Sequence, residues 1–452
     1  MVKHSFTLII TVFITLLSVN LAAPAEPLTL DWNAAWKMAL EKSDAILAAG
    51  DEWQKANHKV SEAYASAMPT VDFSSSFQHY FEVPSTIFNL PNFDDPSGPS
   101  TRIKTQFGSE NNIGLSATLS QPLWLAGKIG LALQAAEDYR ELSGLSMGVS
   151  KVDLKLNLTQ AFYGVLVAEE FVKVSQDALT QAERHRKQAQ ALFDQGMVSE
   201  YDLLRAGVAV ANIKPQVIAA EIARDLALKA LKSIIGLDVD AEVKLMGSLD
   251  QDIEPPQPYT SALSQALDKR LEFRQLDLQK SLFGIQYEVE KRGVLWPNFL
   301  LNLGWQSQAQ KDDFKFNKYE FLGGWGATLV MQVPLFDGFA SHHRAEAAKV
   351  DIRSVSRQRE MLERGVKIQV YQALGEFRKA SEELKAAEET LGQADKGLSI
   401  AELRYREGVG TQLEALDAQM QLTQSKLNVL QAQYSLLISR AAYERAVGMG
   451  VE

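Results

Sequence analysis

Few side chains in this 452-residue sequence have the type and spacing that metal binding or catalysis requires. The one pair of adjacent histidines is His342-His343. Neighbouring residues on a helix point about 100° apart, so these two rings do not converge on one ion. The chain has no cysteine, and it contains no phosphate-binding loop, dinucleotide fingerprint or nucleophile motif. The sequence therefore predicts no metal site, no cofactor and no catalytic residue, which disfavours an enzyme.

The first 25 residues have the organisation of a secretory signal peptide, which we place at residues 1–25. Lys3 and His4 give a basic start, residues 6–19 are uncharged, and Ala23-Pro24-Ala25 has small residues at the cleavage spacing. The apolar run is too short for a membrane-spanning helix, and no later segment has 18 consecutive apolar residues. The formal net charge of −10 argues against nucleic acid as a partner. We therefore expect an exported protein, in which any membrane insertion uses strands.

The sequence contains an internal duplication. Three pairs of motifs keep an offset of 212 residues. Such self-similarity predicts two structural repeats, which we place at residues 26–249 and 260–452, joined by a proline-rich linker at 250–259. The paired motifs are Gln121-Pro122-Leu123-Trp124 with Val333-Pro334-Leu335-Phe336, Phe193-Asp194-Gln195-Gly196 with Tyr405-Arg406-Glu407-Gly408, and Ile235-Gly236 with Val447-Gly448.

Four segments alternate apolar and polar residues, which is typical of strands with one apolar face. We place the strands at 70–82, 111–122, 298–308 and 320–333, and we interpret the Pro- and Gly-rich residues 82–109 as a loop. Each strand has about 10 residues or more, enough to cross a bilayer when tilted. A soluble sheet with one buried face would show the same alternation. The small polar residues on the second face favour a wet lumen.

Helical periodicity dominates the rest of each repeat. We predict long helices at 128–194 and 340–406, each about 100 Å long at 1.5 Å per residue. Returning helices follow at 200–235 and 411–447. The last helix has residues at alternating spacings of three and four, which is a coiled-coil seam. Its members are Leu413, Leu416, Met420, Thr423, Leu427, Leu430, Tyr434, Leu437 and Ala441.

Three further features complete the helical prediction. Shorter helices, at 31–67 and 261–292, precede the strands. The returning helix of the first repeat has a weaker seam, and Pro215 within it is expected to kink or locally open the helix. The other members of that seam are Tyr201, Leu204, Val208, Ala211, Ile218 and Ile222.

Four strands per chain are too few for a membrane barrel, since the smallest known barrels have about eight. An open sheet in lipid leaves edge N–H and C=O groups without partners. Other copies must therefore complete the sheet, most simply in a cyclic oligomer. The predicted fold class is mainly α with membrane β. It combines an internally duplicated coiled-coil tunnel of long helices with four strands per chain contributed to an oligomeric β-barrel.

This plan and its turn motifs resemble the TolC-type outer-membrane efflux proteins. The similarity covers essentially the whole mature chain and is carried by Val333-Pro334-Leu335-Phe336-Asp337-Gly338 and Tyr405-Arg406-Glu407-Gly408-Val409-Gly410-Thr411. The resemblance implies a homotrimer in outer-membrane lipid of a Gram-negative bacterium, with a shared barrel and a periplasmic helical tunnel. It also implies a periplasmic adaptor (membrane-fusion) protein and an inner-membrane RND or ABC transporter. The channel itself would be a passive exit duct for efflux or type I secretion.

The resemblance places functional residues at two helix turns. Glu414 and Asp417, with Asp202 as the repeat mate of Glu414, fall on positions that narrow the periplasmic end of the pore. Tyr405 falls on a position that holds the helices closed. Around a three-fold axis, acids become rings of like charge that select cations and raise each other's pKa values. Two solvated acids on a helix flank are the plainer alternative. The turn tips, where adaptor or pump contact is expected, are Gly196, Ser199, Gly408, Gly410 and Thr411.

The chain departs from the best-known members of that family at Gly410, where an arginine can take part in the closing network. Arg406 is the candidate replacement. The main alternative function is a periplasmic coiled-coil scaffold whose strands form a soluble sheet. The sequence does not identify the exported substrate, because tunnel-lining residues are generic and the pump largely determines the cargo.

Overall fold

The computed structural model of the chain describes residues 28–90, 101–251, 253–315 and 318–450, so the predicted signal peptide lies outside the described residues. The chain divides into two compact units, and each unit contains segments of both predicted repeats. Unit 1 comprises Met1–Ser43, Asn157–Ile253 and Glu383–Leu437; unit 2 comprises Asp44–Leu156, Glu254–Glu382 and Ile438–Glu452.

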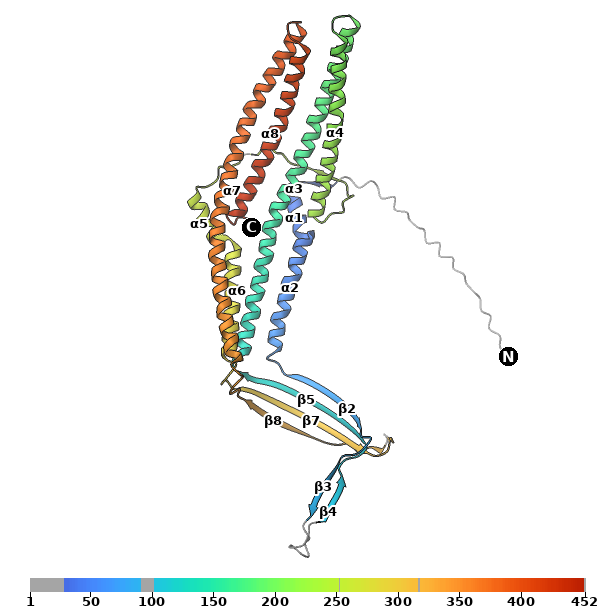
Figure 1. Cartoon of the computed structure of the whole chain (residues 1–452), viewed down its shortest axis with the longest axis vertical. Helices are drawn as coiled ribbons and strands as arrows, with labels where there is room; N and C mark the ends of the chain where they lie inside the picture. Colours follow the sequence, from blue (N-terminus) through green and yellow to red (C-terminus); the bar gives the residue numbers. More distant parts are fainter. Residues whose placement is uncertain (1–27, 91–100, 252, 316–317, 451–452) are drawn as a thin grey trace, which may run out of the picture. The chain divides into compact units, whose positions relative to one another are not determined.

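Unit 2 contains an antiparallel four-stranded sheet (Figure 1). Its strands, in spatial order, are β2 (Thr70–His79), β5 (Asn111–Leu125), β7 (Asn298–Lys311) and β8 (Leu322–Gln332). The register aligns Phe73, Ala117, Trp305 and Trp325 across the sheet, and it aligns Ser74, Ser116, Gln306 and Gly324 in the next row. The alternation of the sequence therefore becomes one apolar and one polar face. β2 and β8 form the two edges of this sheet.

The prediction of a loop at 82–109 is wrong in part. β3 (Ser85–Leu90) and β4 (Thr101–Gln106) form a separate antiparallel hairpin between β2 and β5. Pro84 precedes β3 and does not interrupt it, and β-branched and aromatic residues such as Ile87 and Phe88 favour strands. The proline content thus concealed two short strands.

The long helices begin and end at or within one residue of the predicted positions. They are α3 (Lys128–Asp194), α4 (Glu200–Ile234), α7 (Ala340–Arg406) and α8 (Gln412–Ala446). Helix α4 continues through Pro215 without interruption, so the expected local opening does not occur. Within the described part of the chain, no helix is long and apolar enough to cross a membrane.

The two helices that precede the strands are each broken once, which contradicts the single helices predicted at 31–67 and 261–292. The first consists of α1 (Trp32–Lys42) and α2 (Asp44–Ala65), and the second of α5 (Tyr259–Lys269) and α6 (Leu271–Lys291). The residues at the breaks, Ser43 and Arg270, have ψ values of 128° and 121°. These extended conformations cannot continue an α-helix.

A glycine packs against each break. In unit 1, a Cβ on Gly236 would lie 2.3 Å from the Lys42 carbonyl oxygen; in unit 2, a Cβ on Gly448 would lie 3.1 Å from the Arg270 nitrogen. Both glycines also have positive φ, at 68° and 78°. The Ile-Gly and Val-Gly motifs of the duplication therefore pack against the helix break at the equivalent place in each repeat. In unit 1, β1 (Leu28–Leu30) additionally pairs in parallel with β6 (Val243–Leu245).

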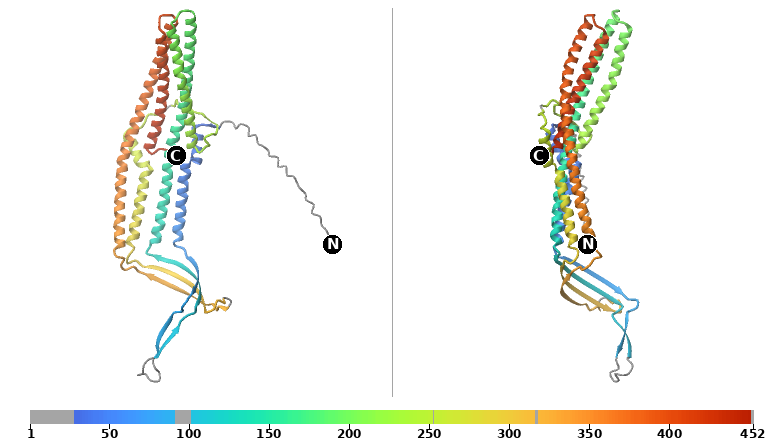
Figure 2. Two further views of the ribbon diagram at one scale, coloured as in Figure 1. Left: turned by 45° about the vertical axis from the view of Figure 1, so that its right-hand side comes forward. Right: turned by 60° about the vertical axis from the view of Figure 1, so that its left-hand side comes forward.

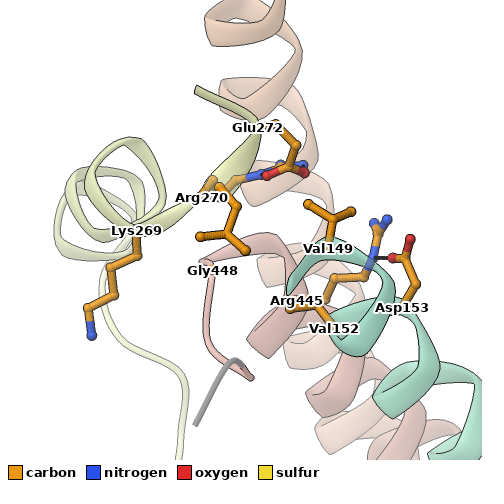
Figure 3. Close-up of a pocket in the computed structure, with 9 residues that line it drawn as sticks. Val149, Val152, Asp153, Lys269, Arg270, Glu272, Arg445 and Gly448 are labelled. Carbon is orange, nitrogen blue, oxygen red and sulfur yellow. Dashed lines mark hydrogen bonds and ion pairs between the residues drawn. The ribbon is translucent and has the colours of Figure 1, made fainter. Parts of the chain in front are cut away.

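The break at Arg270 is filled by a charged cluster (Figure 3). The side chain of Arg270 is only 7% exposed, and its Nη2 donates to Glu272 Oε1 at 2.6 Å. Its Nη1 donates to Gln369 on α7 at 2.7 Å. Nearby, Arg445 donates to Asp153 at 2.7 Å. Burial raises the pKa of Glu272, but the Arg270 hydrogen bonds, a backbone hydrogen bond and the charges of Arg270 and Arg445 together leave the pKa below its usual value.

We expect Glu272→Gln to lower stability by about 1–2 kcal/mol near neutral pH, because Arg270 stays buried without a charged partner. A depressed pKa means that the contribution is complete above the unfolded-state pKa of about 4.3 and is lost as the pH falls through the folded value. The difference in melting temperature between the wild-type chain and the variant should therefore shrink below about pH 4. Circular dichroism melts near neutral pH and below about pH 4 measure this difference in melting temperature. The exposed Glu360→Gln is the control. A difference that is independent of pH would contradict the assignment.

Candidate functional site

Two helical hairpins in unit 1 end in turns with the same hydrogen bonds. The N–H groups of Gly196 and Gly408 each donate to the carbonyl three residues earlier, at 2.8 and 3.1 Å. The next N–H in each turn donates to the carbonyl five residues earlier, at 2.9 and 3.0 Å. Both glycines have left-handed φ values, 71° and 74°, which glycine adopts without steric cost. The two predicted tips are therefore built alike.

The residues that follow each glycine cap the returning helices. Ser199 Oγ accepts from the Asp202 N–H at 3.2 Å, and the Asp202 carboxylate accepts from the Ser199 N–H and hydroxyl at 3.2 and 2.7 Å. This is a complete capping box. Thr411 Oγ1 likewise accepts from the Glu414 N–H at 3.2 Å. The Asp202 carboxylate thus caps its own helix, whereas the Glu414 carboxylate contacts a residue of another helix.

That residue is Arg404, whose Nε lies 3.4 Å from Glu414 Oε2. Both side chains are about half exposed, so the pair contributes roughly 0.2–1 kcal/mol. Arg404, and not the suggested Arg406, is therefore the arginine that contacts Glu414. Gly410 packs against the same residue: a Cβ there would lie 2.8 Å from Arg404 Cβ. An arginine at position 410 does not fit this turn.

Tyr405 lies near Asp202, whereas Asp417 stands apart from both. Burial raises the pKa of the half-buried Tyr405 phenol, and the negative charge of Asp202 raises it further. The last turn of α7 therefore lies close to the first turn of α4. Asp417 is exposed, one turn beyond Glu414 on α8. The structure brings together two of the four predicted constriction residues and leaves the others on the surface of α8.

A polar contact between α3 and α7 escaped the sequence analysis. Gln181 Nε2 donates to Glu402 Oε1 at 3.2 Å. His185, one turn away on α3, has a pKa lowered by burial and partly restored by the charge of Glu402. Its Nε2 atom is buried and has no hydrogen-bond partner among the described residues. His185 is the residue by which the sequence could have indicated this contact. No other histidine lies near it in the sequence, so no motif singled it out.

Toward its start, α8 packs within the chain through a row that precedes the predicted seam by one or two residues. Leu413 and Met420 of that seam are 41% and 62% exposed. The Oε1 atoms of Gln412 and Gln419 are buried without a hydrogen-bond partner in the described part of the chain. Near the turn, the predicted seam is therefore not the row through which α8 packs within its own chain. The buried row comprises Gln412, Ala415, Leu422, Ser425, Val429, Ala432 and Leu436.

The polar face of the unit 2 sheet is a second candidate surface. A shallow hollow lies on this face, and no charged residue lines it. Ser74 and Ser116 are hydrogen-bonded across it, with 2.7 Å between their hydroxyl oxygens. Such a surface is wettable and neutral, which suits passage of solutes without charge selection. Its main polar lining residues are Ser74, Ser76, Ser116, Gln306, Ser307 and Gln308.

Comparison with known proteins gives one consistent match. The profile of the outer membrane efflux protein family matches residues 35–237 and 262–449. The chain is 24% identical over 326 residues to the cobalt-zinc-cadmium resistance protein CzcC of Cupriavidus metallidurans, covering 70% of this chain and 72% of that protein. It is 21% identical over 352 residues to the outer membrane protein TolC of Escherichia coli, covering 75% of this chain and 70% of that protein.

Solved structures share the fold. The Campylobacter jejuni CmeC outer membrane channel aligns with a TM-score of 0.71 and 17% identity, over 93% of this chain and 86% of that chain. CusC aligns with a TM-score of 0.73 and 15% identity, over 96% of both chains. The arrangement of long helices and membrane strands is therefore the one that these channels have.

We expect Gly410→Arg to loosen the second turn rather than fasten it, because its Cβ collides with Arg404. A strain of about 1–2 kcal/mol corresponds to roughly tenfold faster amide exchange around residues 404–414. Hydrogen–deuterium exchange measures this. Gly397→Arg on α7 is the matched control, because nothing lies within 4 Å of its Cβ position. Slower exchange in the position 410 variant would show that an arginine latch forms there after all.

Proposed function

The chain belongs to the outer membrane efflux protein family, and we propose that three copies of it form the exit duct of an efflux or secretion system. Membership makes the protein a channel of the outer membrane with a large periplasmic helical portion. It leaves the alternative of a coiled-coil scaffold without a barrel unsupported. The proposal concerns the number of copies, the residues at the constriction and the partners.

The open sheet is the observation that carries the proposed assembly. β2 and β8 are edge strands of the four-stranded sheet, and their outer N–H and C=O groups need partners in lipid. Further copies supply those partners when β8 of one chain pairs with β2 of the next. Three copies would give twelve strands, within the range of known membrane barrels.

Helix α4 supports the same conclusion. Every member of its predicted seam is exposed in the single chain; Leu204 and Ile218, for example, are 62% and 57% exposed. Helix α4 instead uses Ala206, Val210 and Val217 for packing within the chain. An apolar heptad row with no partner of its own is the surface that a neighbouring copy would cover.

We place the periplasmic constriction at Glu414, Asp417, Asp202 and Tyr405. Because Arg404 engages Glu414, Asp417 would contribute most of the free negative charge to a ring around the axis. The similarity to a protein named for cobalt, zinc and cadmium resistance supports a path that favours cations. Tyr405 beside Asp202 would tie α7 to α4 in the closed state.

The hairpin tips would meet the partners. We propose that a periplasmic adaptor and an inner-membrane RND or ABC transporter act at Gly196, Ser199, Gly408, Gly410 and Thr411, and that the transporter supplies the energy. The duct itself would catalyse nothing. The matching hydrogen bonds of the two turns support the two repeats proposed from the sequence, 26–249 and 260–452.

The native mass after detergent extraction from outer membranes tests the assembly, and we expect three chains. Ile218→Glu should lower the temperature at which the trimer dissociates, because it buries a charge in the interface between copies. Gln216→Glu adds the same charge to an exposed position of α4 outside the seam and is the control. A monomer released without detergent would contradict the proposal.

Bilayer recordings test the constriction. We expect Asp417→Asn and Glu414→Gln each to reduce cation selectivity, since each removes one negative charge per copy while Arg404 keeps its positive charge. The double variant should bring the reversal potential in a salt gradient toward zero. Glu388→Gln, exposed on α7, is the control. Unchanged reversal potentials in the double variant would remove these residues from the ion path.

A further inference from the structure

Two helices of unit 2 each leave a heptad row uncovered. We define the open face of α2 as Asp44, Leu47, Asp51, Gln54, His58 and Ser61. We define the open face of α7 as Val350, Ser354, Arg357, Met361, Arg364 and Ile368. Both rows keep alternating spacings of three and four, and every residue in them is exposed except Ser354, which is half-buried. Leu47, Met361 and Ile368 are 51%, 62% and 67% exposed.

These faces lie at opposite sides of unit 2. Contacts order its helices: Trp53 of α2 packs on Gly144 of α3, Arg274 of α6 is paired with α3, and Arg359 of α7 is paired with α6. The order α2, α3, α6, α7 follows the strand order β2, β5, β7, β8 and is visible in Figure 2, left. Closing the sheet between copies, β8 to β2, therefore brings α7 of one copy beside α2 of the next.

We propose that the open face of α7 packs antiparallel on the open face of α2 of the next copy, in one defined register. This inference rests on the shared barrel proposed above and specifies the helix contact that accompanies it. The paired positions are Asp51 with Arg357, Leu47 with Met361, and Asp44 with Arg364.

The three pairs are chemically complementary: two join an aspartate to an arginine, and one joins two apolar side chains. In an antiparallel pair, each step along one helix is matched by the reverse step along the other. The two aspartates are seven residues apart on α2, and the two arginines are seven apart on α7. One register therefore forms both ion pairs and places Leu47 against Met361 between them. Gln54 then faces Ser354, and His58 faces Val350 without an ionic contribution.

The height of each position above the sheet supports the register. Asp51 lies about 21 Å from the end of α2 at Ala65, and Arg357 lies about 25 Å from the start of α7 at Ala340. The second ion pair shows the same difference, about 31 against 36 Å. A mismatch of about 5 Å is within the reach of an arginine side chain and of the short connections to the strands.

None of the four charged residues has an ion-pair partner among the described residues of its own chain. Asp44 has a local role, because an acid in the first turn stabilises the helix start. Asp51 and the arginines lie inside their helices and have no such role. Buried charges in a seam specify register, since a shift by one heptad in either direction leaves two of these four charges unpaired. Shifting the helices by one heptad would leave one ion pair, Asp44 with Arg357, and place Asp51 against Val350.

The absence of cysteine from the chain allows a direct test. We expect Leu47→Cys with Met361→Cys to form an intermolecular disulfide in outer membranes, seen as covalent dimers and trimers on a denaturing gel. Leu47→Cys with Ser354→Cys is the matched control, because it reports the register shifted by one heptad. Each single variant should stay monomeric on the gel.

Charge reversal provides a second readout on the cysteine-free chain. Asp51→Arg and Arg357→Asp should each lower the dissociation temperature of the trimer, and the double variant should restore it. Cross-linking through position 354, or no restoration in an intact trimer, would overturn the register. A native mass of one chain in the wild type would instead overturn the shared barrel, so the two failures are distinguishable.

Discussion

The rest of this structure depends on the backbone groups at the edges of one sheet. β2 and β8 each present a row of N–H and C=O groups that lipid cannot hydrogen-bond. A soluble protein can leave such edges to water, but a membrane strand must be paired. The chain is therefore incomplete as a single copy. The exposed heptad rows on α2 and α7 follow from the same fact, because a helix that adjoins an edge strand has a neighbour on only one side within its own chain.

The two repeats have the same glycines at their turns and helix breaks, but different side chains beside them. Both returning helices begin after a left-handed glycine, and both end with a glycine against a break in an earlier helix. At the first break the extended residue is a small buried serine, Ser43, whereas at the second it is Arg270 with two polar partners. At the turns, Asp202 completes a cap and Glu414 reaches Arg404. The two repeats thus share the glycine positions at which backbone packs against backbone, and they differ in the side chains around those positions.

Sequence reasoning predicted the features that depend on local pattern. The long helices and the two faces of the sheet follow from periodicity, and the turns follow from glycine with a following cap residue. Sequence reasoning missed features that depend on contacts with residues distant in the sequence. A glycine distant in the sequence packs against each break, at Ser43 and at Arg270, and no local pattern reports that contact. Likewise, the pattern on α8 predicted a seam of large apolar residues, but near the turn the single chain buries the neighbouring row that begins with Gln412. Burial is decided by the neighbour, and in this protein some neighbours belong to another copy.

Three buried polar atoms near the hairpin turns, His185 Nε2, Gln412 Oε1 and Gln419 Oε1, lack hydrogen-bond partners within the described chain. A buried polar group without a partner costs about 1–3 kcal/mol relative to the hydrated group. Separating the helices there would return that energy through hydration. The apolar stretch of α8 farther from the turn, which includes Val429 and Leu436, offers no such return. Hydration therefore lowers the free energy of local opening near the turns, where we propose that the constriction lies.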